Sequence, residues 1–335
     1  MLKNYKNKLV VGVVGLGVGA FHLSNSLAYK DCKVKYICDT NKKKLLYYKK
    51  KFNIQFATKN FDDVVNDEEI NIIIIASNDN DHAYQVLKAL KNNKHVFVEK
   101  PMCLSFKDLN RIIRMKNRKP NLCLSTNLTL RTHPFFSELI KKKSKLKKIY
   151  YLEGDYNYGR LDKLTKGWRG KIKDYSVILG GGIHLLDLIL KLKGKKVKEI
   201  YTLGNKIITN KFKNTPNDFA VSLLKFEDNS IAKISSNFSS STDHHHIFNI
   251  HSKDTSLFYK RNKSEQFFRE KENKSTIELK YKHYNKTKGL MLENFFDKIR
   301  TKKKKLIISE NELFYLMKIC LILVQSQKKN KTIRL

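Results

Sequence analysis

Residues 8–22, with the sequence KLVVGVVGLGVGAFH, constrain the fold of this chain more than any other stretch. The apolar run at 9–14 predicts a strand that is buried on both faces. Glycines follow at once, and Ala20, Leu23 and Leu27 then recur at i, i+3 and i+7, the spacing of one helix face. A strand, a glycine turn and a helix in this order are the context in which a G-x-G-x-x-G/A pattern indicates dinucleotide binding.

The small residues of this turn have separate expected roles. Gly15 allows the tight turn, Gly17 lets a pyrophosphate approach the backbone, and Ala20 takes the third, small position where the helix meets the strand. Free N–H groups at the start of the helix attract phosphates. The predicted phosphate-binding residues are Gly15, Leu16, Gly17, Val18, Gly19 and Ala20.

An acidic residue completes the nucleotide pattern. Asp39 closes the strand predicted at 34–38 and lies 24 residues after Gly15. A carboxylate there accepts hydrogen bonds from ribose hydroxyls and repels a 2′-phosphate, so NAD is favoured over NADP. The lysines at 42–44 keep NADP open, because a basic cluster tolerates a phosphate. The simpler alternative is a plain loop with Asp39 as a helix cap.

Strands and helices alternate through the first third of the chain. Strands are predicted at 54–57, 72–76 and 95–98, with helices between them, and this alternation predicts a doubly wound parallel sheet. The four isoleucines of 72–75 indicate a central strand. Ligands of such folds bind at the carboxyl edge of the sheet, so the cofactor-binding candidates there are Ser77, Asn78 and His82.

The tripeptide Glu99-Lys100-Pro101 ends the strand at 95–98. Proline biases the residue before it towards an extended conformation, so the Lys100 side chain should project at the strand end. An ammonium there can stabilise an alkoxide or polarise a carbonyl, as hydride transfer requires. Glu99 and Lys100 are cofactor-site candidates and Lys100 is also a catalytic and substrate-binding candidate. The alternative is one exposed lysine among 68 basic residues.

A second constellation lies at 180–187, GGGIHLLD. The glycines permit a turn with close approach to a ligand, and a helix should follow. His184 and Asp187 are three residues apart, so they share a helix face. A histidine is suited to take a hydroxyl proton near neutral pH, and Asp187 could orient its ring or simply sit in the first turn. The alternative is a buried histidine without a catalytic role.

The rest of the second half supplies substrate-binding candidates and a second sheet. Strands predicted at 197–208, 219–226, 230–238 and 246–251 indicate an antiparallel or mixed sheet, and 309–312 reads as a capping box. The triplet at 244–246 is not a predicted metal site, because adjacent strand residues point to opposite faces. Trp168 could also simply fill a loop core. The side chains that could stack on a sugar or hold a phosphate are Tyr156, Tyr158, Arg160, Trp168 and Arg169.

The turn at 15–22, Asp39, His82 and the Glu99-Lys100-Pro101 motif together resemble the glucose–fructose oxidoreductase/inositol dehydrogenase (Gfo/Idh/MocA) family. The resemblance implies an N-terminal Rossmann domain and a C-terminal α/β domain whose open sheet covers the nicotinamide site. It also implies that the lysine of the motif contacts substrate and cofactor.

Two further segments carry this resemblance into the second half. Residues 131–134 resemble the arginine-x-x-proline segment that opens the family's second domain, which makes Arg131 a substrate-binding candidate. The family pattern D-x-x-x-H-x-x-D matches His184, its acid/base, and Asp187. Its first aspartate is replaced here by Gly180, which shifts the expected chemistry to Lys100 and His184.

Composition excludes several other classes of protein. The net charge of +37 would suggest nucleic acid or a membrane surface, but the lysines are scattered along the chain. Five cysteines without a C-x-x-C pair argue against disulfides or zinc and fit a reducing cytoplasm. Residues 9–21 superficially resemble a signal peptide, but alternating glycines and the lack of an A-x-A site argue against one. The longest apolar runs elsewhere are too short to span a bilayer.

The combined expectation is an α/β protein with an NAD-binding domain at 1–127 and a substrate-binding and oligomerisation α+β domain at 128–335. We expect it to transfer hydride between nicotinamide and a carbohydrate-type alcohol or ketone, with Lys100 and His184 flanking the reacting carbon. A homo-oligomer, either a dimer or a tetramer, is expected. The alternatives are an inactive NAD-binding sensor or scaffold, and a nucleic-acid-binding protein.

Overall fold

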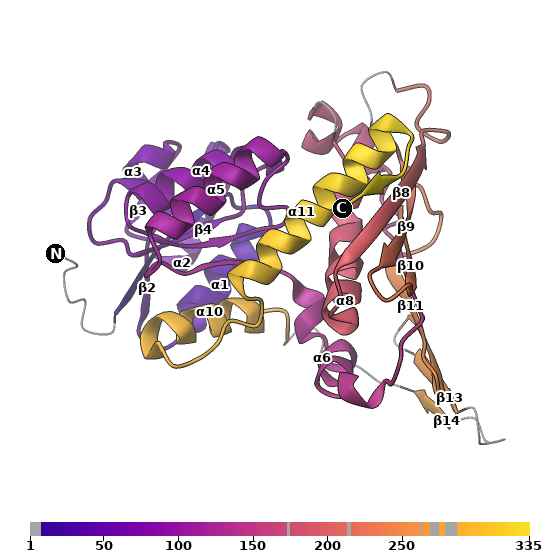
Figure 1. The fold of residues 1–335 in the computed structure, drawn as a ribbon. Coiled ribbons are helices and arrows are strands. Elements are labelled where there is room, and N and C mark those ends of the chain that lie inside the picture. The colour runs from indigo at the N-terminus through magenta and orange to yellow at the C-terminus, as the bar shows by residue number, and fades with distance from the viewer. Residues whose placement is uncertain (1–7, 173–174, 213–215, 262, 269–274, 279–286) are drawn as a thin grey trace. The chain divides into compact units, whose positions relative to one another are not determined.

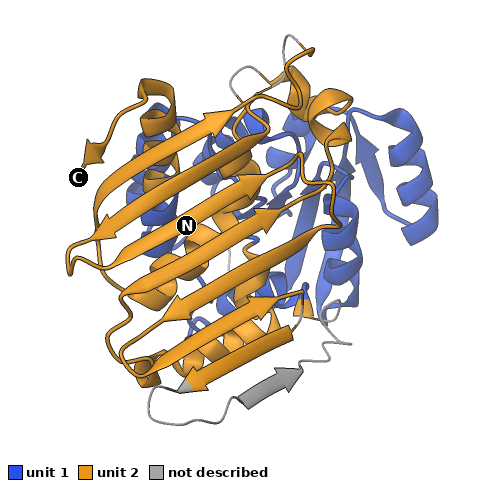
Figure 2. Cartoon of the chain, turned by 90° about the vertical axis from the view of Figure 1, so that its right-hand side faces the viewer, with its two compact units in different colours: residues 1–127, 288–317 blue, residues 128–287, 318–335 orange. Residues whose placement is uncertain are grey.

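The computed structural model describes residues 8–172, 175–212, 216–261, 263–268, 275–278 and 287–335. The chain forms two compact units, coloured separately in Figure 2. Unit 1 contains residues 1–127 and 288–317, and unit 2 contains residues 128–287 and 318–335. Each unit is therefore assembled from two separate stretches of the chain.

Unit 1 is built on a six-stranded sheet in the order β3-β2-β1-β4-β5-β6, with all neighbouring strands parallel. Figure 1 labels β2, β3 and β4 of this sheet. The strand order reverses between β1 and β4, the point at which such sheets bind ligands. The predicted doubly wound sheet, with the isoleucine strand at its centre, is confirmed. The strands are β1 Leu9–Val14, β2 Cys32–Cys38, β3 Phe56–Thr58, β4 Ile72–Ile75, β5 His95–Val98 and β6 Leu124–Thr126.

Six helices of the described chain complete unit 1. Their bounds are α1 Gly19–Ala28, α2 Lys42–Phe52, α3 Phe61–Val65, α4 Asp79–Lys91, α5 Phe106–Arg118 and α10 Leu290–Thr301. In α1 the side chains of His22 and Leu23 are buried, whereas Leu27 is 37% exposed. The late helix α10 packs within this unit, because Phe296 contacts Tyr29 and Phe295 contacts Phe97.

Unit 2 contains a nine-stranded sheet in the order β14-β13-β12-β11-β7-β10-β9-β8-β15. Only the β7–β10 pair is parallel among its described pairs, so the expected open, mostly antiparallel sheet is confirmed. The strands are β7 Tyr151–Asn157, β8 Val197–Asn205, β9 Phe219–Phe226, β10 Ile231–Asn237, β11 His245–His251, β12 Thr255–Lys260, β13 Lys263–Phe268, β14 Ser275–Glu278 and β15 Ile333–Arg334.

Two strands form in the charged segment at 264–282 where the structure describes it. β13 and β14 form there because backbone pairing with β12 continues the ladder, whatever the side-chain charge. Residues 269–274 and 279–282 of that segment lie outside the described residues.

The helical segments of unit 2 position its candidate residues. They are η1 Thr129–Thr132, α6 Pro134–Lys141, η2 Lys143–Lys145, α7 Asp162–Thr165, η3 Trp168–Lys171, the π-helical η4 Ile178–Gly182 and α8 Ile183–Lys193. Helix α11, Glu310–Lys329, begins in unit 1 and ends in unit 2. The expected capping box starts it: the Ser309 N–H donates to Glu312 Oε2, and the Glu312 N–H donates to Ser309 Oγ.

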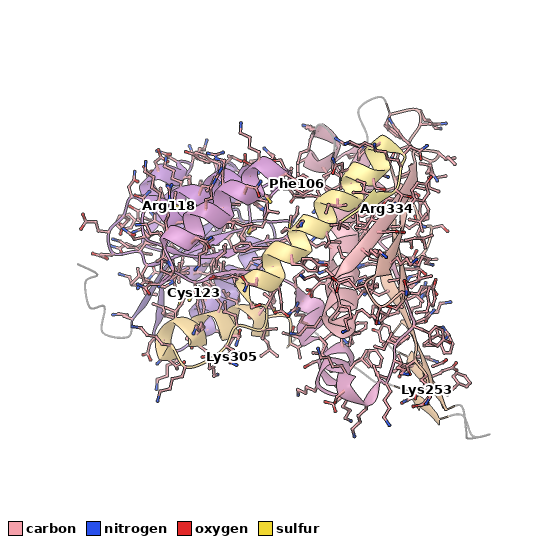
Figure 3. All side chains as sticks on the ribbon, viewed as in Figure 1. Phe106, Arg118, Cys123, Lys253, Lys305 and Arg334 are labelled. Atoms are coloured by element: carbon pink, nitrogen blue, oxygen red, sulfur yellow. The ribbon has the colours of Figure 1, made fainter. Side chains whose placement is uncertain are left out.

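The described helices and the positions of some basic residues bear on the classes that composition suggested. Within the described ranges, no helix is both long and apolar enough to cross a bilayer. Figure 3 labels Arg118, Lys253, Lys305 and Arg334, which belong to four different parts of the chain. Basic side chains are thus spread over both units, and the expected absence of nucleic-acid binding stays a prediction.

Candidate active site

The turn between β1 and α1 requires glycine for two different reasons. Gly15 has φ +84°, and a Cβ there would lie 2.6 Å from the Ser77 nitrogen, so only glycine fits. A Cβ at Gly19 would lie 3.1 Å from Ala76 Cβ and 3.5 Å from Val13 Cγ1, where the helix meets the sheet. Gly19, rather than the expected Ala20, therefore takes the third small position of the fingerprint. Helix α1 begins at Gly19, and Ala20, the next residue, is only half-buried.

Gly17 lies at the open side of the same turn. Among the residues that the structure describes, no heavy atom outside its own chain neighbourhood lies within 4 Å of the position of a Cβ there. No side chain caps the start of α1, whose N-cap residue is Val18. Open space above the turn and an uncapped helix start fit the phosphates of a dinucleotide.

Asp39 is held directly against this turn. Its Oδ2 accepts a hydrogen bond of 2.6 Å from the Leu16 N–H, and its Oδ1 accepts one of 2.8 Å from the Asn41 N–H. The plain helix-cap alternative for Asp39 was wrong, since the side chain of Asn41 caps α2 by accepting from the Lys44 N–H. The residues present fit NAD: Gly15 to Gly19 would hold the pyrophosphate and Asp39 the ribose hydroxyls.

The variant Gly17→Val separates phosphate binding from folding. Because the added side chain meets open space, the free energy of unfolding without cofactor should change by less than about 0.5 kcal/mol. The Kd for NADH should rise at least about tenfold, because the side chain fills the space that a pyrophosphate needs. Fluorescence titration with NADH measures it. An unchanged Kd would contradict the phosphate assignment, and Gly15→Val is the contrasting variant that should destabilise the fold itself.

Two of the polar residues after β4, Ser77 and His82, form hydrogen bonds to other groups of unit 1. Ser77 donates from its hydroxyl to Gln85 Oε1 at 2.7 Å, and Asn78 is the N-cap residue of α4. His82 is fully buried, with Nδ1 2.8 Å from the Pro101 carbonyl oxygen and Nε2 3.2 Å from the Ser77 carbonyl oxygen. His82 therefore ties the end of β4 to the Glu99-Lys100-Pro101 turn.

A buried polar network supports Lys100. The Lys100–Pro101 peptide is cis, and Lys100 itself is half-buried. Glu99 accepts hydrogen bonds of 2.7 Å from His22 Nε2 and of 2.7 Å from Asn127 Nδ2. Burial alone would raise the pKa of Glu99, but the His22 hydrogen bond and charge, followed by the Lys100 charge, hold it below its ordinary value. An ionised Glu99 thus fixes the backbone from which Lys100 projects.

The glycines at 180–182 do not form the expected turn. They lie in the buried π-helical η4, which continues directly into α8. A Cβ at Gly181 would lie 2.6 Å from Tyr156 Cδ1, and one at Gly182 would overlap Ser236 Oγ. The turn prediction was wrong, because these glycines let a helix approach β7 and β10 closely rather than a ligand.

Asp187 has a partner other than His184. Both of its oxygens accept from Arg131, with Nε–Oδ2 at 2.8 Å and Nη2–Oδ1 at 2.7 Å. The two side chains are 2% and 3% exposed. Asp187 therefore anchors the segment that opens unit 2, and Arg131 directs its guanidinium into this ion pair.

His184 belongs to a cluster of rings that the sequence reading missed. Its ring stacks on that of Tyr156, with 6.2 Å between the ring centres and 18° between the ring planes. The Tyr156 ring also contacts the rings of His244 and His246, with 5.1 and 5.2 Å between ring centres. Burial, followed by the charges of neighbouring histidines, lowers the pKa of His246 to about 3, so this ring is neutral near pH 7. His244 lies immediately before β11 and its ring contacts that of His246 at 4.9 Å between ring centres. Within the described residues, no group of three metal-ligating side chains gathers.

The remaining substrate candidates form two arginine–aromatic pairs. The Arg160 guanidinium lies 5.2 Å from the Tyr158 ring centre, and that of Arg169 lies 4.4 Å from the Trp168 ring centre. A separate hollow of about 840 Å³ lies on unit 1 between α4 and α5. None of the predicted site residues lines it, so it is not assigned to the chemistry.

A parallel sheet with a glycine turn and a carboxylate held against that turn, together with a second unit built on a mostly antiparallel sheet, is typical of a dinucleotide-binding α/β protein. Residues 9–127 match the family model described as "Oxidoreductase family, NAD-binding Rossmann fold", and residues 138–258 match that of the GFO/IDH/MocA C-terminal domain. The chain belongs to the Gfo/Idh/MocA family of oxidoreductases. The expected family and its NAD-binding domain are confirmed.

Similar proteins agree with this assignment. An uncharacterized oxidoreductase of Bacillus subtilis is 26% identical over 235 residues, covering 68% of this chain and 66% of that protein. The myo-inositol 2-dehydrogenase of Thermotoga maritima is 25% identical over 232 residues, covering 67% of each. The chain thus matches about two thirds of the length of these relatives. The structure of scyllo-inositol dehydrogenase from Lactobacillus casei with NAD(H) and scyllo-inositol has a TM-score of 0.82 at 19% identity, covering 98% of this chain and 99% of that one.

Proposed function

We propose that this protein is an NAD(H)-dependent dehydrogenase that oxidises a hydroxyl group of a polyol or sugar, or reduces the corresponding ketone. The observation that carries the proposal is the open glycine turn with Asp39 bound to its backbone, in a chain of an oxidoreductase family. Bound NAD would supply the hydride acceptor. The names of the inositol dehydrogenases support a polyol as substrate.

Lys100 and His184 are the groups that we propose to handle the substrate oxygen. The Lys100 ammonium would donate a hydrogen bond to that oxygen and stabilise its developing negative charge. His184 would take the hydroxyl proton during oxidation and return it during reduction. The ion pair of Asp187 with Arg131 leaves the proton chemistry to His184.

A substrate panel with native mass spectrometry tests the function. The purified protein should retain or bind NAD(H), and one of myo-inositol, scyllo-inositol, a sugar acid or a sugar nucleotide should give NADH absorbance at 340 nm. Tight NADH binding with no turnover of any of these would instead support the inactive sensor or scaffold.

Asp39→Ala tests the choice of nucleotide. The variant removes the carboxylate that repels a 2′-phosphate and leaves the exposed lysines at 42–44 in place. We expect the ratio of kcat/KM for NAD to that for NADP to fall at least about tenfold, since a charge repulsion of this kind is worth roughly 1–2 kcal/mol. Initial rates with both cofactors measure it, with Asp63→Ala, at an exposed acid on α3, as control. An unchanged ratio would sink the assignment of Asp39 to the ribose.

We also propose that the protein is a cytoplasmic homo-oligomer. In Figure 2 the sheet of unit 2 shows a broad face with no described helix of unit 2 in front of it. Leu223 of β9 and Ile231 of β10 point to the face of the sheet opposite α8, and their side chains are 50% and 45% exposed. Apolar side chains on an uncovered sheet face favour association with a second copy. Light scattering in solution tests it, and a monomer at micromolar concentration would contradict it.

A further inference from the structure

Tyr175 occupies the space that a side chain at position 180 would take. A Cβ built on Gly180 would lie 2.7 Å from Tyr175 Cζ and would overlap the phenol oxygen. Tyr175 is only 5% exposed, so its ring has little freedom to move away. Gly180 lies four residues before His184 on the continuous helix formed by η4 and α8. The Tyr175 hydroxyl therefore lies against the same helix, one turn before His184.

Three side chains fix the position of this hydroxyl. Arg169 donates from Nε to the Tyr175 oxygen at 3.1 Å, while its guanidinium stacks on Trp168. The Tyr175 ring meets Trp168 edge-on at 6.4 Å and Phe238 at 6.5 Å. A phenol oxygen can accept a hydrogen bond and donate another. Since Arg169 uses an acceptor position, the hydroxyl proton points away from Arg169.

The same ring cluster connects Tyr175 to His184. Phe238 contacts Tyr156 at 6.2 Å, and Tyr156 stacks on the His184 ring. Gly180 lies four residues before His184 on the helix of η4 and α8, so a group in the side-chain space of residue 180 lies about one turn from His184. A hydroxyl and an imidazole one helical turn apart suit two hydroxyl groups of one polyol.

We propose that Tyr175 is a substrate-binding residue that hydrogen-bonds a second hydroxyl group of the substrate, besides the one handled by His184. Arg169 is then a positioning residue that acts through Tyr175. The assignment rests on the proposed function and deepens it, because it requires a substrate with a second hydroxyl group. The chain departs from the D-x-x-x-H-x-x-D pattern at Gly180. The missing side chain there leaves the space that the Tyr175 hydroxyl occupies.

The single tryptophan of the chain, Trp168, gives a direct optical readout of this site. Protein saturated with NADH is titrated with myo-inositol, scyllo-inositol or levoglucosan while tryptophan emission is followed, with calorimetry as a second measurement. NADH is the reduced cofactor and each titrant is the reduced, alcohol form of the substrate, so no turnover occurs. Tyr175→Phe should weaken polyol binding and lower kcat/KM by about tenfold or more, because it removes one hydrogen bond to the substrate and keeps the ring. The Kd for NADH should not change.

Two further variants keep the outcome decisive. Tyr150→Phe, at a 52% exposed tyrosine, should leave polyol binding unchanged. Tyr175→Gly should lose polyol binding, and adding Gly180→Asp to it should restore part, because a carboxylate then enters the vacated space. Wild-type polyol binding and turnover in Tyr175→Phe, or no recovery in the double variant, would overturn the assignment while the dehydrogenase function stands. If the wild-type protein binds NADH but binds and oxidises none of the polyols, sugar acids and sugar nucleotides, the proposed function fails as well.

Discussion

Lys100→Met should lower kcat about a hundredfold to a thousandfold, the usual loss when one preorganised hydrogen-bond donor to a developing oxyanion is removed. Methionine keeps most of the length of the side chain and removes only its charge and donors. The network of Glu99 with His22 and Asn127 holds the backbone in place, so the fold and the Kd for NADH should persist. Steady-state kinetics and NADH titration measure the two effects separately.

The matched control is Lys107→Met, at an exposed lysine in the first turn of α5. It removes the same charge from the same unit and should leave kcat unchanged. Full activity in Lys100→Met would remove Lys100 from the chemistry. A parallel loss in both variants would point to net charge rather than to a specific contact.

Asp187→Asn should cost stability before it costs chemistry. It leaves the buried Arg131 guanidinium without its counter-charge, and breaking such a pair typically costs about 3–5 kcal/mol. For a unit of this size we expect the unfolding midpoint to fall by roughly 10 °C. The double variant Arg131→Met, Asp187→Leu should recover most of the loss, because it removes both charges. Thermal unfolding of the cofactor-free protein measures this.

The exposed pair of Glu138 with Lys142 is the control for Asp187. Glu138→Gln should hardly change the midpoint, since water already solvates both groups. If Asp187→Asn instead keeps its midpoint and loses kcat, Asp187 orients the catalytic ring after all, and its structural assignment is wrong.

Local patterns were enough to predict most of the fold of unit 1. The run of isoleucines at β4 and the glycine turn after β1 each specify their structure through residues adjacent in sequence. Asp39 could be placed by its spacing, because the parallel sheet brings the ends of β1 and β2 to the same edge. The exception was Gly19: helix α1 begins one residue earlier than the fingerprint suggested.

Unit 2 was harder, because its site is made by residues far apart in the chain. Arg131 and Asp187 are 56 residues apart, and nothing local marks them as partners. The glycines at 180–182 look like a flexible turn in sequence, and only the facing Tyr156, Tyr175 and Ser236 show why a helix needs them there. The sequence likewise does not reveal that the Tyr175 hydroxyl occupies the side-chain position of Gly180, because only the packed structure brings the two together.

The return of residues 288–317 to unit 1 has a consequence for synthesis. Phe295 and Phe296 are fully buried there, and they cover Phe97 and Tyr29. The nascent nucleotide-binding region thus leaves the ribosome with an uncovered aromatic surface. This surface is covered only after residues 288–317 have also been translated, and until then it is the kind of exposed apolar surface that promotes aggregation.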